Sequence, residues 1–296
     1  MGTSASSSGP GGGVPLVPAW VPSAPIPPMP LNNIPSQIGV VGSGEVKPIK
    51  PIDAIKPTKS PQKKQQLQNK LAPSGRFAGA RLNIRKFAKS GDSGVLKKAL
   101  GNYVRKGIGG SSMGARRMAG TAHTAGALFG VLSALKDGQI KALDLGIDPK
   151  SLVGKTAKEI IDVIVEAVRP VDGSQDSEVS RQSIDAATSD LLNMYHNANL
   201  LSLEPEQVES LIEFYVSHDV CERIDMDLGN IIQSKAQNAS MAVTRLEDMK
   251  KFIAADVHSA FVERRKQGMV LKRGQVTQLV NQILKDVFDI FEEYLK

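Results

Sequence analysis

Residues 118–135, MAGTAHTAGALFGVLSAL, are an uncharged stretch of eighteen residues between Arg117 and Lys136. Four small residues recur at every fourth position of this stretch, namely Ala122, Gly126, Gly130 and Ala134. On a helix they leave one face almost without side chains, which another helix can approach closely. A transmembrane helix needs about 20 strongly apolar residues, and two threonines, a histidine and a serine dilute this stretch. We therefore expect the buried central helix of a bundle.

The region from residue 151 to residue 296 has helical patterns throughout. Thr156 and Glu159 form a T-x-x-E capping box ahead of an apolar run, and Pro170 with Gly173 is expected to end that helix. Further helical patterns cover residues 176–200, 205–234, 238–267 and 274–295, the last with a wide apolar stripe. Because only short loops separate these segments and no alternating strand pattern is found, we predict an all-α fold with an antiparallel helical bundle as its body.

Residues 76–110 are basic and are predicted to form two helices. The first lies in RFAGARLNIRKFAKSG, from residue 76, and the second in SGVLKKALGNYVRKGIGG, from residue 93. The apolar residues of both lie at helical spacing. Gly107, Gly109 and Gly110 are expected to break the chain after the second helix.

Residues 110–114, Gly-Ser-Ser-Met-Gly, match the G-x-S-x-G pattern of serine hydrolases. That chemistry needs a buried strand before the serine, so that the turn is strained and the hydroxyl exposed. A basic helix and a glycine-rich break precede it here. We therefore predict that Ser111 or Ser112 is the N-cap of the next helix, and we predict no catalytic residue.

Two further motifs are incomplete. Gly154-Lys155-Thr156 resembles the end of a phosphate-binding loop, but Pro149 occupies the position of the required first glycine. His218 and Cys221 could supply two metal ligands, whereas zinc takes three or four protein ligands. We predict no metal site and a core position for Cys221. The acidic residues beside it are predicted to form a solvated face: Asp219, Glu222 and Asp225.

Residues 1–75 are predicted to be a disordered or partner-bound extended tail and linker. Thirteen of the 17 prolines lie at or before Pro61, among glycine, serine and single apolar residues. Proline donates no backbone hydrogen bond, so coil and polyproline II are the expected states. After this tail we predict two further parts of the chain: basic and small-residue-rich helices over 76–140, and an acidic helical bundle over 141–296.

Charge divides the chain in the same way. Residues 1–140 hold 19 Lys and Arg against 4 Asp and Glu, and residues 141–296 hold 18 against 26. Opposite charges indicate either internal electrostatic docking or a basic arm for an anionic partner. Candidate anion or partner contacts are Arg105, Lys106, Arg116 and Arg117.

Gly2 follows the initiator methionine, and a residue this small permits removal of Met1. An α-amino group has a pKa of about 7.7–8.0 against about 10.4 for lysine, so its neutral, nucleophilic fraction at neutral pH is several hundred times larger. Glycine also fits a narrow tunnel because it has no Cβ. An acyl-transfer enzyme could therefore select this amine. Met1, Gly2 and Ser6 also match the N-myristoylation pattern, which is short.

Several stretches resemble the QatB family of the bacterial Qat anti-phage defence system. They are MGTSASSSGPGGGVPLVPAW from residue 1, RFAGARLNIRKFAKSGD from residue 76, LKKALGNYVRKGIGGSSMGARRMAGTAHTAGALFGVL from residue 96, and GIDPKSLVGKTAKEIIDVIVEAV from residue 146. The resemblance covers most of residues 1–170. It implies an operon that also encodes an ATPase, a QueC-like enzyme and a TatD-like nuclease.

QueC enzymes use ATP to activate a 7-carboxy-7-deazaguanine and deliver an amine to it. The resemblance implies that the QueC-like partner conjugates this base to Gly2, so the chain would be a non-enzymatic scaffold and substrate. Tail residues expected to contact the partner are Thr3, Ser4, Pro10, Pro15, Pro18 and Trp20. No intrinsic cofactor is expected; ATP, zinc and the deazaguanine belong to the QueC-like enzyme. The ATPase and the nuclease are further candidate partners.

The single cysteine and the lack of a signal-peptide pattern in residues 1–13 predict a cytoplasmic location, and the resemblance implies a bacterial cell. Two alternatives to the substrate role remain open. The basic helices could make the chain a nucleic-acid-binding subunit. The helices over 76–136 could instead act on a membrane, although we do not expect a membrane partner.

Overall fold

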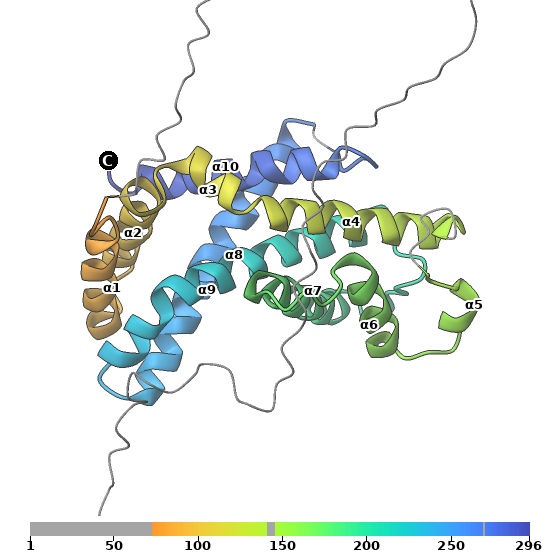
Figure 1. The fold of residues 1–296 in the computed structure, drawn as a ribbon, viewed down its shortest axis with the longest axis horizontal. Coiled ribbons are helices and arrows are strands. Elements are labelled where there is room, and N and C mark those ends of the chain that lie inside the picture. Colours follow the sequence, from red (N-terminus) through yellow and green to blue (C-terminus); the bar gives the residue numbers. More distant parts are fainter. Residues whose placement is uncertain (1–72, 141–145, 269) are drawn as a thin grey trace, which may run out of the picture. The chain divides into compact units, whose positions relative to one another are not determined.

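The computed structural model describes residues 73–140, 146–268 and 270–296. Every regular element in these ranges is a helix (Figure 1). The helices are α1 (Ala78–Ser90), α2 (Ser93–Asn102), the π-helix η1 (Tyr103–Ile108), α3 (Ser111–Arg117), α4 (Ala119–Lys136), α5 (Pro149–Leu152), α6 (Ala157–Val168), α7 (Gln175–Met194), α8 (Pro205–Lys235), α9 (Ala239–Lys266) and α10 (Val276–Glu293). The predicted all-α fold class is thus confirmed. The predicted tail lies, up to residue 72, outside the described residues.

The helix ends follow local sequence chemistry. The predicted capping box is formed: Glu159 Oε2 accepts a hydrogen bond from the Thr156 backbone N–H at 2.8 Å, and Thr156 Oγ1 accepts one from the Glu159 backbone N–H at 3.3 Å. α7 ends at Met194 rather than near residue 200. Tyr195 leaves the helical conformation, with φ of −122° and ψ of 77°, and in the turn that follows the side-chain oxygen of Asn199 accepts a hydrogen bond from the Leu201 backbone N–H at 3.0 Å.

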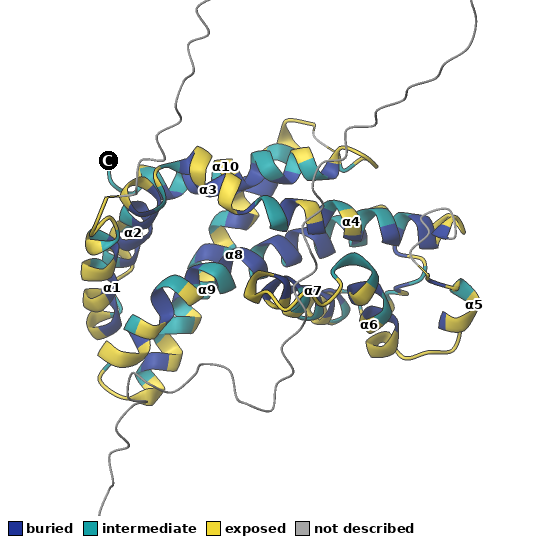
Figure 2. Ribbon diagram, viewed as in Figure 1, coloured by how far each residue is buried: buried dark blue, intermediate teal, exposed yellow. Residues whose placement is uncertain are grey.

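One continuous core joins the helices on both sides of residue 141. It includes Phe87 of α1, Leu100 of α2, Leu128 of α4 and Phe288 of α10. α4 packs against α6, α8 and α10, which confirms its central position. Figure 2 shows buried residues on the inward sides of these helices and exposed residues on the outward side of α1.

Only part of the small-residue face of α4 is in close contact with another helix. Ala122 and Ala134 are buried. A Cβ on Gly126 would overlap the Thr277 hydroxyl of α10, so the close approach predicted for this face occurs there. A Cβ on Gly130 would meet nothing within 4 Å, so no helix is in close contact at that position.

The predicted break after α2 is correct at two of its three glycines. Gly109 and Gly110 have φ of 96° and 101°, values that favour glycine. Gly107, by contrast, is buried inside η1, where a Cβ would overlap the Phe77 ring. Its function is therefore to admit an aromatic ring rather than to end a helix.

The predicted serine N-cap of α3 is wrong. Gly110 occupies the N-cap position, and Ser111 is the first helical residue. The Ser111 backbone N–H, which has no partner within α3, donates a hydrogen bond to Glu292 Oε1 of α10 at 2.9 Å. A carboxylate near a helix N-terminus also has a favourable interaction with the helix dipole, so α10 caps α3 from outside.

No single helix in the described ranges is long and apolar enough to span a membrane. α3 and α4 meet the length and composition criteria only as a pair, and they are bent by 54° at Met118.

Candidate functional site

Two carboxylates of α8 attach the basic segment, residues 76–140, to the acidic helices of residues 141–296. Asp227 Oδ2 accepts a hydrogen bond from the Tyr103 hydroxyl at 2.7 Å, and it lies 3.0 Å from Arg117 Nη2. Burial raises the pKa of Tyr103 well above its usual value, and the neighbouring Asp227 charge raises it further. Tyr103 therefore stays neutral and keeps its proton for the hydrogen bond.

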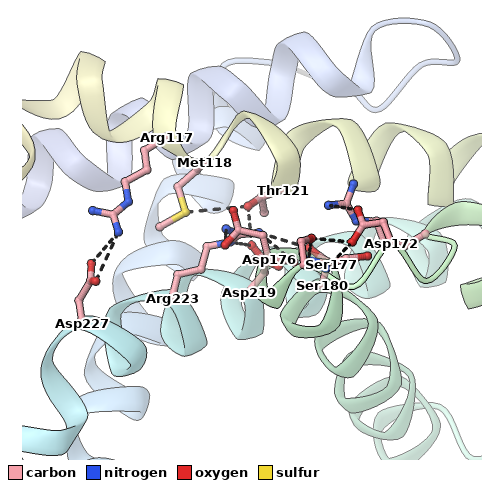
Figure 3. Close-up of polar contacts among 12 residues, drawn as sticks. Arg117, Met118, Thr121, Asp172, Asp176, Ser177, Ser180, Asp219, Arg223 and Asp227 are labelled. Atoms are coloured by element: carbon pink, nitrogen blue, oxygen red, sulfur yellow. Dashed lines mark hydrogen bonds and ion pairs between the residues drawn. The ribbon is translucent and has the colours of Figure 1, made fainter. Parts of the chain in front are cut away.

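Asp219 lies eight residues before Asp227 on α8 and is fully buried. It accepts hydrogen bonds from three side chains: the Thr121 hydroxyl of α4, the Ser180 hydroxyl of α7 at 2.8 Å, and Arg223 Nε at 2.6 Å (Figure 3). The solvated face predicted for Asp219 is therefore wrong. Because an isolated charge in the core is costly, this carboxylate must be paired and hydrogen-bonded.

Arg223 completes the cluster by a second ion pair with Asp176, at 3.0 Å. Burial alone would lower the pKa of Arg223, but Asp219 and Asp176 together raise it above its usual value. Both oxygens of Asp219 accept hydrogen bonds from protein donors, so this network joins α4, α7 and α8.

Cys221 and His218 have separate partners. Cys221 is buried, as predicted, and its thiol contacts the Lys250 carbonyl oxygen at 3.4 Å. His218 Nε2 lies 2.7 Å from Asp190 Oδ2. Glu222 and Asp225 are half-buried, and Lys250 lies 2.6 Å from Glu222. In the described part of the chain, no group of three or more His, Cys, Asp or Glu residues could hold a metal ion.

The outward side of α1 carries four exposed cations that we call the basic face: Arg81, Arg85, Lys86 and Lys89. The opposite side of the helix is buried against the core through Ala80, Ile84, Phe87 and Ala88. The cations therefore point to solvent because the apolar spacing of α1 fixes the rotation of the helix.

The four predicted contact cations differ in their environment. Arg117 is paired with Asp227, so it has a structural partner. Arg105 and Lys106 on η1 and Arg116 on α3 are exposed, and none of them has an ion-pair partner within the described ranges. Arg116 also lines a shallow groove of about 570 Å³ between α3 and α10, together with Lys285.

The predicted tail contacts lie outside the described residues. This applies to the modification site Gly2 and to Thr3, Ser4, Pro10, Pro15, Pro18 and Trp20, as well as to Ser6 of the myristoylation pattern. Sequence reasoning missed Tyr103, Asp219 and Asp227 as anchoring residues. Their partners are far away in the sequence, so no local spacing could have identified them.

Comparison with known proteins identifies a family. A protein-family model described as "Qat anti-phage system associated protein QatB" matches residues 109–291, more than half of the chain. No curated protein and no solved structure matches.

Proposed function

The chain belongs to the QatB family and is a component of an anti-phage defence system, and we propose that it acts there as a scaffold and protein substrate. In this proposal the α-amine of Gly2 is the group that is modified. A QueC-like, ATP-dependent enzyme of the same operon joins it to a 7-deazaguanine base. The observation that carries the proposal is the family membership, together with a glycine directly behind Met1.

The chemistry of the amine supports this choice of site. At neutral pH about a tenth of an α-amine is unprotonated, against far below one per cent of a lysine side chain. The enzyme uses ATP to activate the carboxyl group of the base. The amine attacks the carbonyl carbon of this activated group, and an amide forms as the activating group leaves. The amine loses its proton in this step. All 24 lysines of the chain are weaker competitors on these grounds.

The folded body supports a scaffold role. Gly2 and the first described residue, Pro73, are separated by a length of chain that could reach about 240 Å if fully extended. The helical body can therefore bind a partner at a surface remote from the site of modification. Once it is bound, the linked amine has a high effective concentration at the partner's active site. The ATPase and the TatD-like nuclease of the operon are further partners in this proposal.

The test is the intact mass of the chain after expression with and without the QueC-like partner. We expect the partner to add the mass of one deazaguanine acyl group to the chain lacking Met1, with the adduct on the N-terminal peptide. Gly2→Pro removes the primary amine and should abolish the adduct and the defence. Gly11→Pro, which leaves the amine intact, is the matched control.

Gly2→Ala distinguishes the two reasons given for glycine, which are the low pKa of its α-amine and the absence of a Cβ. It retains a primary amine of similar pKa but adds a Cβ, so a loss of modification in this variant would indicate a narrow tunnel. An unmodified chain under conditions where defence operates would contradict the proposal.

A further inference from the structure

The basic face has a regular geometry. Arg81, Arg85 and Lys89 are spaced by four residues, so they follow one side of α1 at intervals of about 6 Å. Lys86 lies on the same outward side. Lys98 of α2 and Lys106 of η1 extend the exposed positive charge onto the adjoining elements.

Nearby carboxylates do not neutralise this surface. Within residues 73–140, 146–268 and 270–296, none of the four basic-face cations forms an ion pair. By contrast, most cations of the acidic helices and their loops are paired there: Lys155, Lys158, Arg169, Arg181, Arg223, Arg245, Lys250, Arg264, Arg265 and Lys285. An ordinary solvated face would be expected to mix both signs of charge, so the basic face is complementary to an external polyanion.

We propose that the basic face binds the phosphate backbone of double-stranded nucleic acid without reading its sequence. This inference is independent of the modification of Gly2. Lys and Arg on one side of a helix that itself holds no Asp or Glu provide the counterion-releasing contacts on which such binding depends.

The aromatic residues favour a duplex over a single strand. Single-stranded nucleic acid is bound by stacking its bases on exposed aromatic rings. Phe87 and Tyr103 are buried, and Phe77 is half-buried with its ring centroid 5.8 Å from that of Tyr103. The basic segment thus offers cations and no free stacking platform.

The same surface is a poor match for a protein partner. Protein interfaces are depleted in lysine and have an apolar or aromatic centre. Among the large apolar residues of α1, only Leu82 is exposed, to 52%. One leucine among four cations does not provide such a centre.

The test is equilibrium binding of the full-length chain to a 30-base-pair DNA duplex over a salt series, with the double variant Arg85→Gln/Lys89→Gln. Each phosphate contact contributes about 0.9 to the slope of log affinity against log salt. We expect the variant to reduce the slope by about 2 and the affinity in 0.1 M salt by about fiftyfold. The seven lysines of residues 1–72 are present in both proteins, so the difference reports α1 alone.

Lys155→Gln/Lys158→Gln is the matched control, because it removes two charges from paired lysines of the acidic part. It should leave the slope nearly unchanged. Three results would overturn the proposal: an equal loss in the control, tighter binding of a single strand of the same length, or tighter binding of polyglutamate than of the duplex at equal charge. The last result would indicate an acidic protein as the partner.

Discussion

Tyr103 and Asp227 are 124 residues apart in the sequence, and a hydrogen bond of 2.7 Å joins them. The same carboxylate pairs with Arg117. One side chain of α8 therefore holds both the π-helix that follows α2 and the end of α3. The geometry of the basic segment depends on this contact, because neither η1 nor α3 is long enough to be stable alone.

Tyr103→Phe should lower the free energy of unfolding by about 1–2 kcal/mol, since it deletes a partly buried hydrogen bond to a charged acceptor and leaves the ring in place. Urea denaturation would measure the loss. Tyr195→Phe is the control, because its hydroxyl makes only a 3.3 Å contact with Ser210. A similar loss in both variants would show that the Asp227 contact is not special.

Asp219→Asn should cost about 3–5 kcal/mol, because it leaves the buried Arg223 guanidinium short of one partner and places an amide N–H₂ among donors. The same denaturation experiment applies. Asp162→Asn, at an exposed ion pair with Lys158, should change the stability by less than about 1 kcal/mol. A loss of under 1 kcal/mol at Asp219 would argue against the role of the network.

Gly114→Ala and Gly130→Ala should have opposite effects. A Cβ on Gly114 would lie 2.7 Å from the buried Phe288 ring, and overpacking of this kind costs about 1–3 kcal/mol. A Cβ on Gly130 meets nothing within 4 Å, so the better helix propensity of alanine should add about 0.5–1 kcal/mol. Thermal denaturation of the two variants would measure both effects. A change in stability of the same sign in both variants would contradict the packing described for α3 and α4.

The pH dependence of stability should change with Asp225→Asn. Burial raises the pKa of Asp225, and its Oδ1 has no hydrogen-bond partner in the described structure. The folded state then holds this proton more tightly than the unfolded state, so the stabilising effect of the proton is complete below the unfolded pKa of about 3.9 and is lost as the pH rises through the folded value. The asparagine variant should therefore be more stable than the parent at pH 7, and the difference should disappear only well below the unfolded pKa of about 3.9.

Asp289→Asn provides a control of opposite sign. Burial works against ionisation of Asp289, but hydrogen bonds from Lys285 and Ser111 outweigh it and lower the pKa. Its ionised form stabilises the fold above the unfolded pKa, so the variant should be less stable than the parent at pH 7. A change in stability at pH 7 of the same sign in both variants would contradict the opposite pKa shifts described for Asp225 and Asp289.

Cys221 should react slowly with thiol reagents in the native protein. Burial raises its pKa to about 12, and the thiolate is the reactive form. Ellman's reagent at pH 8 should titrate the cysteine only after unfolding in urea. Ser112→Cys in a Cys221→Ser chain, with its cysteine at an exposed position of α3, should react at once under native conditions. Rapid reaction of native Cys221 would show that α8 and α9 open locally.

The sequence predicted the helices well because each has an apolar period of its own. Thr156 and Glu159, for example, are three residues apart and decide a helix end locally. Asp219 could not be placed in this way. A carboxylate on a long helix gives the same local pattern whether it faces water or the core, and its partners Thr121 and Ser180 are 98 and 39 residues away. Gly107 was misassigned for the same reason, since the ring that needs its space belongs to Phe77, the N-cap residue of α1, which lies 30 residues earlier in the sequence.

Asp219 and Asp227 are separated by about 12 Å along α8, from eight residues at 1.5 Å each. A single contact would allow the α3–α4 junction to pivot on α8, whereas two contacts prevent that rotation. Residues 76–140 hold 12 Lys and Arg against 2 Asp and Glu, while the remainder to residue 296 has 18 against 26. Opposite charges held rigidly apart form an electric dipole with a fixed axis in the molecule. A charged partner would thus orient the body before contact and speed the encounter at low ionic strength.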